Sequence, residues 1–292
     1  MPALPIVLAH GYLGFSSLGP LQYFNNVQSI LRAAGATDIF VSVVSPKQSL
    51  ADRSAQLAAD ITAKYGNRKV HVIAHSMGGL DARILIQQNN PNIATLTTLG
   101  TPFRGTLAAD VALDPRKLAG VSPDRLLQVI AQYERDQLTL DPLGAINQAG
   151  FVIQQLRRAV ANLKTGDYSH LGTYFQGLFS LNDAALGELT TESCRRKFPD
   201  DESDLHGIPS YSYAGSIAPA RVSPALSVSA ILLQATGQEN DGVVPLTSAK
   251  LRNHKETLTL DHLGLVGWTS TDVTPLYRNI YSLIRVTTYL AD

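Results

Sequence analysis

A serine stands between an apolar, β-branched run and two glycines. The run covers residues 70–74, and the next five residues read His-Ser-Met-Gly-Gly, with the serine at position 76. This pattern predicts a buried strand that turns sharply into a helix, which leaves the hydroxyl exposed in strained backbone geometry. Small neighbours are needed because the helix and the strand approach closely. Ser76 is therefore the candidate nucleophile, with Ala74 where the usual G-x-S-x-G pattern has its first glycine.

A serine hydroxyl needs a base that accepts its proton, and the base needs a third group that orients it. When the serine comes first in the chain, both partners are expected on loops nearer the C-terminus. His254 lies in a charged stretch typical of a solvated turn, whereas His262 follows a short strand and precedes Leu-Gly-Leu. We therefore predict His262 as the base.

The orienting group is expected to be a carboxylate on a turn. Asp241 precedes Gly242 and an apolar segment. Asp261 is adjacent to the predicted base, but neighbouring side chains of an extended segment point apart, so Asp261 is poorly placed to reach that imidazole. We predict Asp241 as the acid.

The tetrahedral intermediate of acyl transfer needs two N–H donors, one just after the nucleophile and one from the loop after the first strand. These positions belong to Met77 and Tyr12, whose backbone N–H groups we predict to form the oxyanion hole. We expect His10 to shape the glycine-flanked loop around Tyr12. His71, on a strand, and His75, next to the nucleophile, are expected to be structural.

Strand and helix patterns alternate through the first third of the chain. Such repeats predict an α/β fold, a mostly parallel central sheet with helices on both faces and a site at the carboxyl ends of the strands. We expect a single domain over residues 1–292. The expected strands are 5–9, 39–44, 70–74, 93–99, 210–214 and 256–260, and the expected helices are 21–31, 51–65, 79–88, 186–198, 224–235 and 277–290.

About 75 residues after Arg104 contain no convincing strand, while apolar residues recur at helical spacing. This predicts a helical cap inserted over residues 104–179, which we interpret as a mobile lid rather than an ordinary pair of core helices. Within it, residues 143–163 alternate apolar side chains such as Phe151 and Leu156 with polar ones. One face can then cover the pocket while the other meets water.

Charge and composition limit the partners. Lys and Arg number 24, as do Asp and Glu, so the net charge of zero gives no field that attracts nucleic acid. No apolar run approaches the roughly 20 residues of a membrane span. We expect no nucleic-acid partner, no transmembrane segment and a monomer. Residues 1–5 lack the features of a secretion signal, so we expect an intracellular protein or one secreted after signal removal, with the second favoured.

Several motifs, in their order and spacing, resemble the bacterial true lipases, which are triacylglycerol hydrolases of the α/β-hydrolase fold. The resemblance spans nearly the whole chain. It implies Ser76 as nucleophile, Asp241 as acid, His262 as base, Tyr12 and Met77 as oxyanion donors, and a lid in the cap. The motifs that carry it are residues 5–15, 74–79, 100–102, 180–182, 240–244 and 261–263.

The sequence departs from that family at the positions where family members bind metal ions. Members often bind a structural calcium through a carboxylate two residues after the catalytic histidine, where this chain has Gly264. The zinc-binding insertion of some members has no counterpart between Ser45 and Lys69. Cys194 is the only cysteine, which excludes an intrachain disulfide and a cysteine-based metal site. We expect no metal and no other cofactor.

The expected activity is hydrolysis of acyl glycerols or related lipid esters, at a lipid–water interface, through a covalent acyl-enzyme. A small-ester esterase, a phospholipase or a lipid acyltransferase can share the same triad and differ in pocket and cap. The length of the cap favours a lipid substrate. A non-catalytic binder on this scaffold usually lacks a triad residue, and none is missing here.

Overall fold

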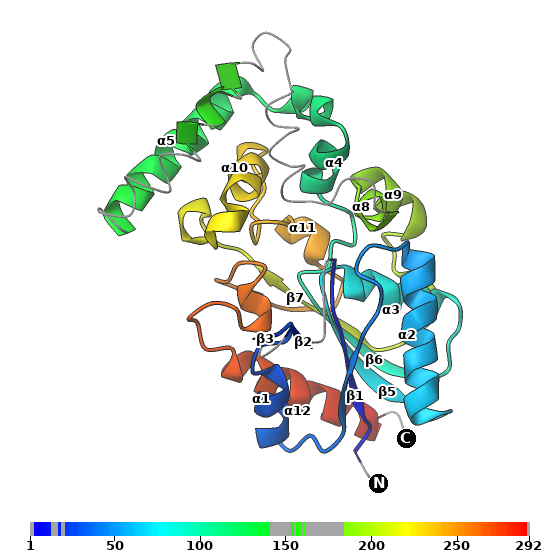
Figure 1. Ribbon diagram of the computed structural model, residues 1–292. Helices are drawn as coiled ribbons and strands as arrows, with labels where there is room; N and C mark the ends of the chain where they lie inside the picture. The colour runs from blue at the N-terminus through cyan, green and yellow to red at the C-terminus, as the bar shows by residue number, and fades with distance from the viewer. Residues whose placement is uncertain are drawn as a thin grey trace.

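A parallel sheet runs through the centre of the molecule (Figure 1). This computed structural model describes residues 3–12, 17–18, 21–140, 153–154, 156–158, 160–161 and 184–290. Within the described residues, every neighbouring pair of strands in this six-stranded sheet is parallel, which confirms the predicted α/β architecture. In spatial order the strands are β4 (Ile39–Ser42), β1 (Ile6–Ala9), β5 (Val70–His75), β6 (Ile93–Leu99), β7 (Ser210–Gly215) and β8 (His254–Leu258).

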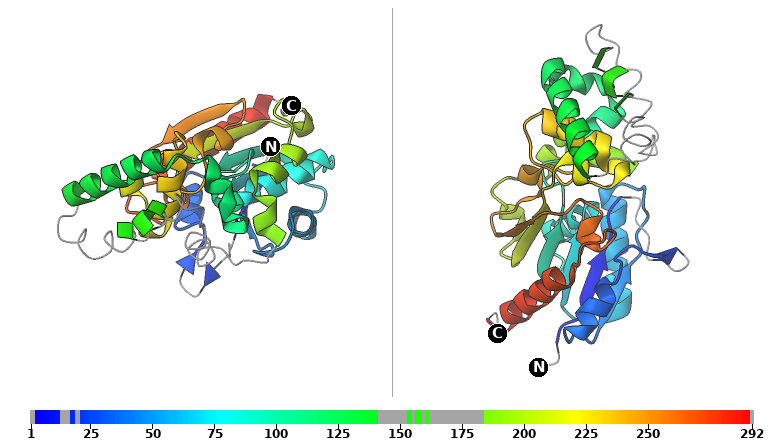
Figure 2. Two further views of the ribbon diagram at one scale, coloured as in Figure 1. Left: turned by 90° about the horizontal axis from the view of Figure 1, so that it is seen from above. Right: turned by 90° about the vertical axis from the view of Figure 1, so that its left-hand side faces the viewer.

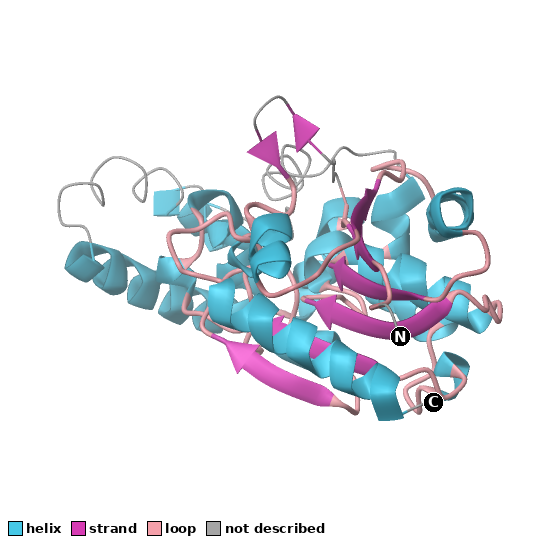
Figure 3. Cartoon of the chain, turned by 90° about the horizontal axis from the view of Figure 1, so that it is seen from below, coloured by secondary structure: helices cyan, strands magenta, loops and turns pink. Residues whose placement is uncertain are grey.

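Helices cover both faces of this sheet, as predicted (Figure 3). Side chains alternate between the faces because successive residues of a strand point in opposite directions. Leu8 and Ile73 therefore share a core with one pair of helices, and Val7 and Val72 share a core with the other pair. The first pair is α1 (Val27–Ala33) and α12 (Thr274–Leu290), and the second is α2 (Leu50–Tyr65) and α3 (Met77–Gln87).

The segment before α1 differs from the prediction of a helix over 21–31. Leu21–Gln22 forms strand β3, which pairs antiparallel with β2 (Ser17–Leu18). Asn26 has φ 62°, a left-handed conformation that a helix running through it would not allow. The apolar spacing was real, since Phe24 and Val27 are both buried, but it reflects packing against α12 and not one continuous helix.

Other boundaries differ where a local cap starts a new element. The helix expected over 186–198 is broken into α8 (Ala184–Glu188) and α9 (Thr191–Lys197), because the Thr190 hydroxyl accepts the N–H of Ser193 and caps α9. The helix expected over 224–235 begins as the 3₁₀ turn η5 (Pro224–Leu226) and continues as α10 (Ser227–Ala235). The short elements after β7 also include η4 (Pro219–Arg221), α11 (Leu246–Ala249) and η6 (Gly264–Val266).

The described part of the chain between β6 and β7 is helical. Its helices are α4 (Leu107–Leu113), η1 (Pro115–Gly120), α5 (Pro123–Leu140), α8, α9 and η3 (Ser203–Leu205). Helices α4 and α5 lie at the end of the molecule opposite both termini (Figures 1 and 2), whereas η3 packs against α3. Helix α5 packs against α10, and Leu126 and Ile130 share an apolar cluster with Ile231.

The expected lid face falls partly outside the described residues, which is where Phe151 lies. Leu156 and Val160 are buried in the same cluster as α5. Arg157 pairs with Glu134 of α5 at 2.8 Å. A charged replacement of Leu156 would therefore disrupt the packing of the cap, so it does not test lid opening cleanly. Movement of the cap stays a prediction.

Candidate active site

Ser76 lies on the sharp turn between β5 and α3. Its backbone, with φ 55° and ψ −130°, occupies a region that residues other than glycine rarely adopt. The surroundings hold it there: the Ser76 N–H donates to the Leu99 carbonyl at 2.9 Å, and the Thr101 hydroxyl donates to the Ser76 carbonyl at 2.9 Å. Both contacts come from the end of β6, so the neighbouring strand fixes the strained turn.

Two glycines let the backbone approach this turn. A Cβ at Gly11 would lie 2.6 Å from the Ser76 Cβ, and a Cβ at Gly78 would lie 2.5 Å from the Ala9 carbonyl oxygen. Neither site has room for a side chain. The loop after β1 therefore lies directly against the serine.

The structure brings His262 and Asp241 together. His262 Nδ1 is 2.7 Å from Asp241 Oδ2, and the His262 N–H donates to the Asp241 carbonyl at 2.8 Å. Asp241 Oδ1 accepts the N–H groups of Val243 at 3.0 Å and Val244 at 2.7 Å, which fixes the carboxylate plane. A carboxylate only accepts, so Nδ1 carries the proton and Nε2 of a neutral His262 is left with its lone pair.

His262 lies beside the serine turn. Its ring centroid is 4.4 Å from that of His75, the residue that precedes Ser76. Gly100, at the end of β6, approaches both partners, since a Cβ there would lie 2.9 Å from Asp241 Oδ2 and 3.1 Å from His262 Nδ1. Among the described residues the Ser76 hydroxyl makes no hydrogen bond. Such bonds often tighten only when substrate is bound.

Asp261 points away from the imidazole that follows it. Its Oδ2 accepts both the N–H and the hydroxyl of Ser223 at 2.6 Å, and its Oδ1 accepts the N–H of Gly264 at 2.7 Å. The side chain is almost completely buried. Asp261 thus ties the His262 loop to the segment between η4 and η5.

The two predicted oxyanion donors, Met77 and Tyr12, come from α3 and from the loop after β1. Met77 is the first residue of α3, and the first N–H of a helix has no partner within it. Tyr12 follows Gly11 in the loop after β1. Arg53 of α2 supports this loop: its Nη2 donates to the His10 carbonyl at 3.0 Å while it pairs with Asp81 of α3 at 2.6 Å.

No pattern in the sequence marks Arg53 as part of the site, because an arginine among polar residues of a helix is typical of a solvated side chain. In the structure it is completely buried. Its Nη1 also donates to the Ser45 carbonyl at 2.7 Å, so its charge is spread over an ion pair and two backbone oxygens. Removing Arg53 would leave Asp81 as a buried charge without its cation.

The other histidines lie apart from the serine or inside the protein. His254 does not lie in a solvated turn, because it is the first residue of β8, where its Nδ1 is 3.0 Å from Ser212 Oγ. His71 Nδ1 is 2.8 Å from Thr95 Oγ1 on the neighbouring strand. His10 donates from Nδ1 to the Gly11 carbonyl at 3.1 Å. These contacts give them structural positions.

Buried neutral histidines predict a loss of stability in acid. Burial lowers the pKa of His10 and of His71 from 6.5 to about 4. The unfolded chain therefore binds protons before the folded one does, so this stability is complete above pH 6.5 and is lost as the pH falls towards 4. At pH 5 each histidine is expected to cost about 2 kcal/mol. Urea unfolding at pH 7, 6 and 5 measures this loss.

A matched control for this prediction is His71→Gln, which removes one of these titrations. Its free energy of unfolding should depend less steeply on pH than that of the unaltered chain, whatever its absolute value. A midpoint that stays constant between pH 7 and pH 5 in the unaltered chain would contradict the prediction.

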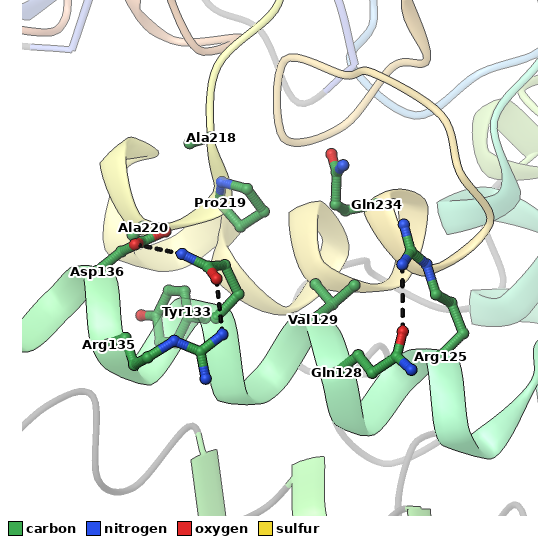
Figure 4. A pocket seen from close by; sticks show the side chains of 11 residues that line it. Arg125, Gln128, Val129, Tyr133, Arg135, Asp136, Ala218, Pro219, Ala220 and Gln234 are labelled. Atoms are coloured by element: carbon green, nitrogen blue, oxygen red, sulfur yellow. Dashed lines mark hydrogen bonds between the residues drawn. The ribbon is translucent and has the colours of Figure 1, made fainter.

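A cavity of about 390 Å³, lined by both polar and apolar side chains, lies between α5, η4 and the end of α10 (Figure 4). Its charged groups are satisfied locally, for example Arg135, which donates to Gln132, and Gln132, which donates to Asp136. Neither Ser76 nor His262 lines it. The cavity is therefore separate from the serine site.

Within the described residues, no three His, Cys, Asp or Glu side chains lie closely enough together to hold a metal ion. Of the helices in the same ranges, none combines the length and the apolar character that crossing a bilayer requires.

Known proteins resemble this chain in sequence. Residues 5–122 match the family described as alpha/beta hydrolase fold. A triacylglycerol lipase of Vibrio cholerae is 26% identical over 94% of this chain and 85% of its own. A triacylglycerol lipase of Pseudomonas fragi is 32% identical over 44% of this chain and 42% of its own.

Solved structures share the fold over nearly the whole chain. A Bacillus licheniformis lipase in its mature form superposes with a TM-score of 0.64 at 21% identity, covering 96% of this chain and 93% of that one. A metagenomic carboxyl esterase superposes with a TM-score of 0.59 at 13% identity, covering 98% and 76%. The chain is thus a hydrolase of the α/β-hydrolase fold that resembles the triacylglycerol lipases, as its motifs predicted.

Proposed function

We propose that this enzyme hydrolyses carboxylic esters of lipids, acyl glycerols foremost, through an acyl-enzyme on Ser76. The single observation that carries the proposal is the 2.7 Å contact between His262 and Asp241 beside the strained turn of Ser76. The similarity to a triacylglycerol lipase along 94% of the chain supports lipid esters over other acyl compounds. The helical segment between β6 and β7, at the end of the molecule where β6 ends, supports the same choice.

In this mechanism Ser76 Oγ attacks the ester carbonyl carbon and its proton passes to Nε2 of His262. The carbonyl electrons move onto oxygen, where the N–H groups of Met77 and Tyr12 stabilise the charge. When the carbon–oxygen bond to the alcohol breaks, His262 gives the alcohol its proton. Water then repeats the sequence and releases the fatty acid. Asp241 holds the Nδ1 proton and stabilises the imidazolium that forms in each step.

The experiment that tests the substrate class compares a dissolved short-chain ester with an emulsified long-chain triacylglycerol. A lipid hydrolase with a cap that opens at an interface is expected to gain activity disproportionately once the substrate exceeds its solubility. Ser76→Ala supplies the blank for both substrates. A rate that rises smoothly through the solubility limit, with a preference for the short ester, would favour the small-ester esterase instead.

The proposed enzyme works without a metal ion, so a chelator is expected to leave its melting temperature and its activity essentially unchanged. Gly264 stands where similar lipases place a calcium carboxylate, and the Asp261 carboxylate is occupied by Ser223 and Gly264. A protein stabilised by a bound metal loses that stabilisation by mass action when the metal is removed. Thermal unfolding with and without EDTA measures the difference, and a fall of many degrees would reveal a metal site.

A further inference from the structure

Three hydrogen bonds link the loop after β1 to the backbone of His262. The Gly11 N–H donates to the Tyr23 hydroxyl oxygen at 3.1 Å. That oxygen is 2.7 Å from His75 Nδ1, and His75 Nε2 is 3.0 Å from the His262 carbonyl oxygen. Tyr23 lies between β3 and α1, so it joins the loop after β1 to His75, which is 52 residues further along the sequence.

The chemistry of the partners determines which atom carries the proton in each of these three hydrogen bonds. The His262 carbonyl only accepts, so Nε2 of His75 must carry a hydrogen. Burial and the neighbouring His262 hold the pKa of His75 well below its ordinary value, so the ring is neutral and its Nδ1 accepts. The Tyr23 hydroxyl therefore donates to Nδ1 and uses its oxygen to accept the Gly11 N–H. Burial raises the pKa of Tyr23 to about 12, which keeps its proton in place.

At one end of this series of hydrogen bonds, a peptide plane next to Ser76 is held in place. The unit that joins His10 to Gly11 is held on both sides, since Arg53 donates to its carbonyl at 3.0 Å and Tyr23 accepts its N–H at 3.1 Å. Gly11 lies against Ser76, and the next N–H along the chain is that of Tyr12. The Tyr12 N–H belongs to the following peptide unit, whose Gly11 carbonyl accepts from His10 Nδ1 at 3.1 Å. The two held units together limit where the Tyr12 N–H points.

The other end fixes the base. The His75 ring lies against the His262 ring with centroids 4.4 Å apart, and its Nε2 holds the His262 carbonyl. Asp241 orients the imidazole through the side chain, whereas His75 holds the backbone of the same residue. The two contacts act on different parts of His262 and do not duplicate each other.

We propose that Tyr23 and His75 are positioning residues that keep the oxyanion loop and the base in register on either side of Ser76. This inference rests on the proposed function of Ser76 and His262. In this role neither side chain contacts the substrate. Both act through groups that stabilise the transition state, so their loss should lower kcat more than it raises KM.

Tyr23→Phe tests the inference because it removes the hydroxyl and keeps the ring. We expect kcat for a soluble ester to fall about 10- to 100-fold, because a small misplacement of reacting groups has effects of this size. KM should change less than about threefold, since ground-state binding is retained. The matched control is Tyr277→Phe, which removes another buried tyrosine hydroxyl, one that donates to the Leu265 carbonyl at 2.9 Å outside the chain.

Stability is measured alongside the kinetics. If the Tyr23 hydroxyl were merely structural, Tyr23→Phe would behave like Tyr277→Phe. The two variants would then have similarly lowered melting temperatures and similar kcat values. The inference requires a loss of kcat in Tyr23→Phe that Tyr277→Phe does not share. A kcat within twofold of the unaltered enzyme in Tyr23→Phe, or an equal loss in both variants, would overturn it.

His75→Gln gives a second test and covers the case in which Tyr23→Phe fails to fold. The glutamine amide can still donate to the His262 carbonyl, but it lacks the ring nitrogen that accepts from Tyr23. The two substitutions break one connection, so kcat of the double variant should fall little further than that of the more impaired single variant. Fully multiplicative losses would contradict a shared chain.

Labelling by a fluorophosphonate probe separates this inference from the proposed function. If the unaltered enzyme is not labelled at Ser76, or if Ser76→Ala still hydrolyses esters, the proposed function fails and this inference falls with it. If Ser76 is labelled and esters are hydrolysed while Tyr23→Phe and His75→Gln keep their full kcat, only the positioning role is wrong.

Discussion

Replacing Ser76 by alanine is expected to lower kcat for a soluble ester by roughly four to six orders of magnitude, because the proposed covalent step loses its only nucleophile. The fold should survive. The contacts that hold the turn are the Ser76 N–H to the Leu99 carbonyl and the Thr101 hydroxyl to the Ser76 carbonyl, and both involve the backbone. Steady-state kinetics and thermal unfolding of the same preparation measure the two effects separately.

The serine hydroxyl contributes little else in the structure, which makes this test clean. Within the described residues it has no hydrogen bond whose loss would destabilise the protein. Some residual hydrolysis is expected from the oxyanion groups and from substrate binding alone. Turnover close to that of the unaltered enzyme would show that another residue attacks the ester, and the whole assignment of the site would be wrong.

Replacing Asp241 by asparagine is expected to lower kcat by about 10⁴-fold. The amide can keep an oxygen for the N–H groups of Val243 and Val244, so the loop should stay folded. Its NH₂ group would then face His262 Nδ1 and would favour the tautomer with the proton on Nε2. That tautomer cannot accept the proton of Ser76.

Asp261→Asn is the matched control for this prediction. The same chemical change then falls on a carboxylate that accepts from Ser223 and Gly264 and does not contact the His262 ring. We expect a lower melting temperature, because the new NH₂ group faces donors at a buried site, with kcat reduced about tenfold or less. If Asp261→Asn were the more damaging change to kcat, Asp261 and not Asp241 would be the acid.

The serine turn could be predicted because the pattern that marks it is local. A continuous apolar run sets the buried strand, and the glycines that follow allow the close approach seen at Gly78. Asp241 and His262 could be proposed from local patterns too, since Asp241 precedes a glycine and an apolar segment and His262 follows a predicted strand. The pairing of the two was a choice among few candidates and not a result of the sequence pattern.

The supports of the site could not be predicted, because they depend on contacts between distant segments. Arg53 reaches Asp81 and the His10 carbonyl from a helix whose sequence looks solvated on that side. The helical spacing predicts that Tyr23 lies inside a helix. In the structure the left-handed Asn26 precedes the helix, and Tyr23 lies before it, where its hydroxyl contacts His75. Helical spacing reports which residues are buried, but it does not report which loop they meet.

The packing of α5 on α10 limits how this enzyme can be recombined with its relatives. Helix α5 belongs to the segment between β6 and β7, whereas α10 and η4 come after β7. One apolar cluster joins the two, and Gln137 of α5 donates to the Ala220 carbonyl at 2.7 Å. A chimera that exchanges only the segment between β6 and β7 would therefore replace half of this apolar cluster. The side chains of the donor protein would then have to pack against the original α10. A donor fragment that continues through Ala235 would carry both sides of this interface, and such crossovers should give folded hybrids where the shorter exchange does not.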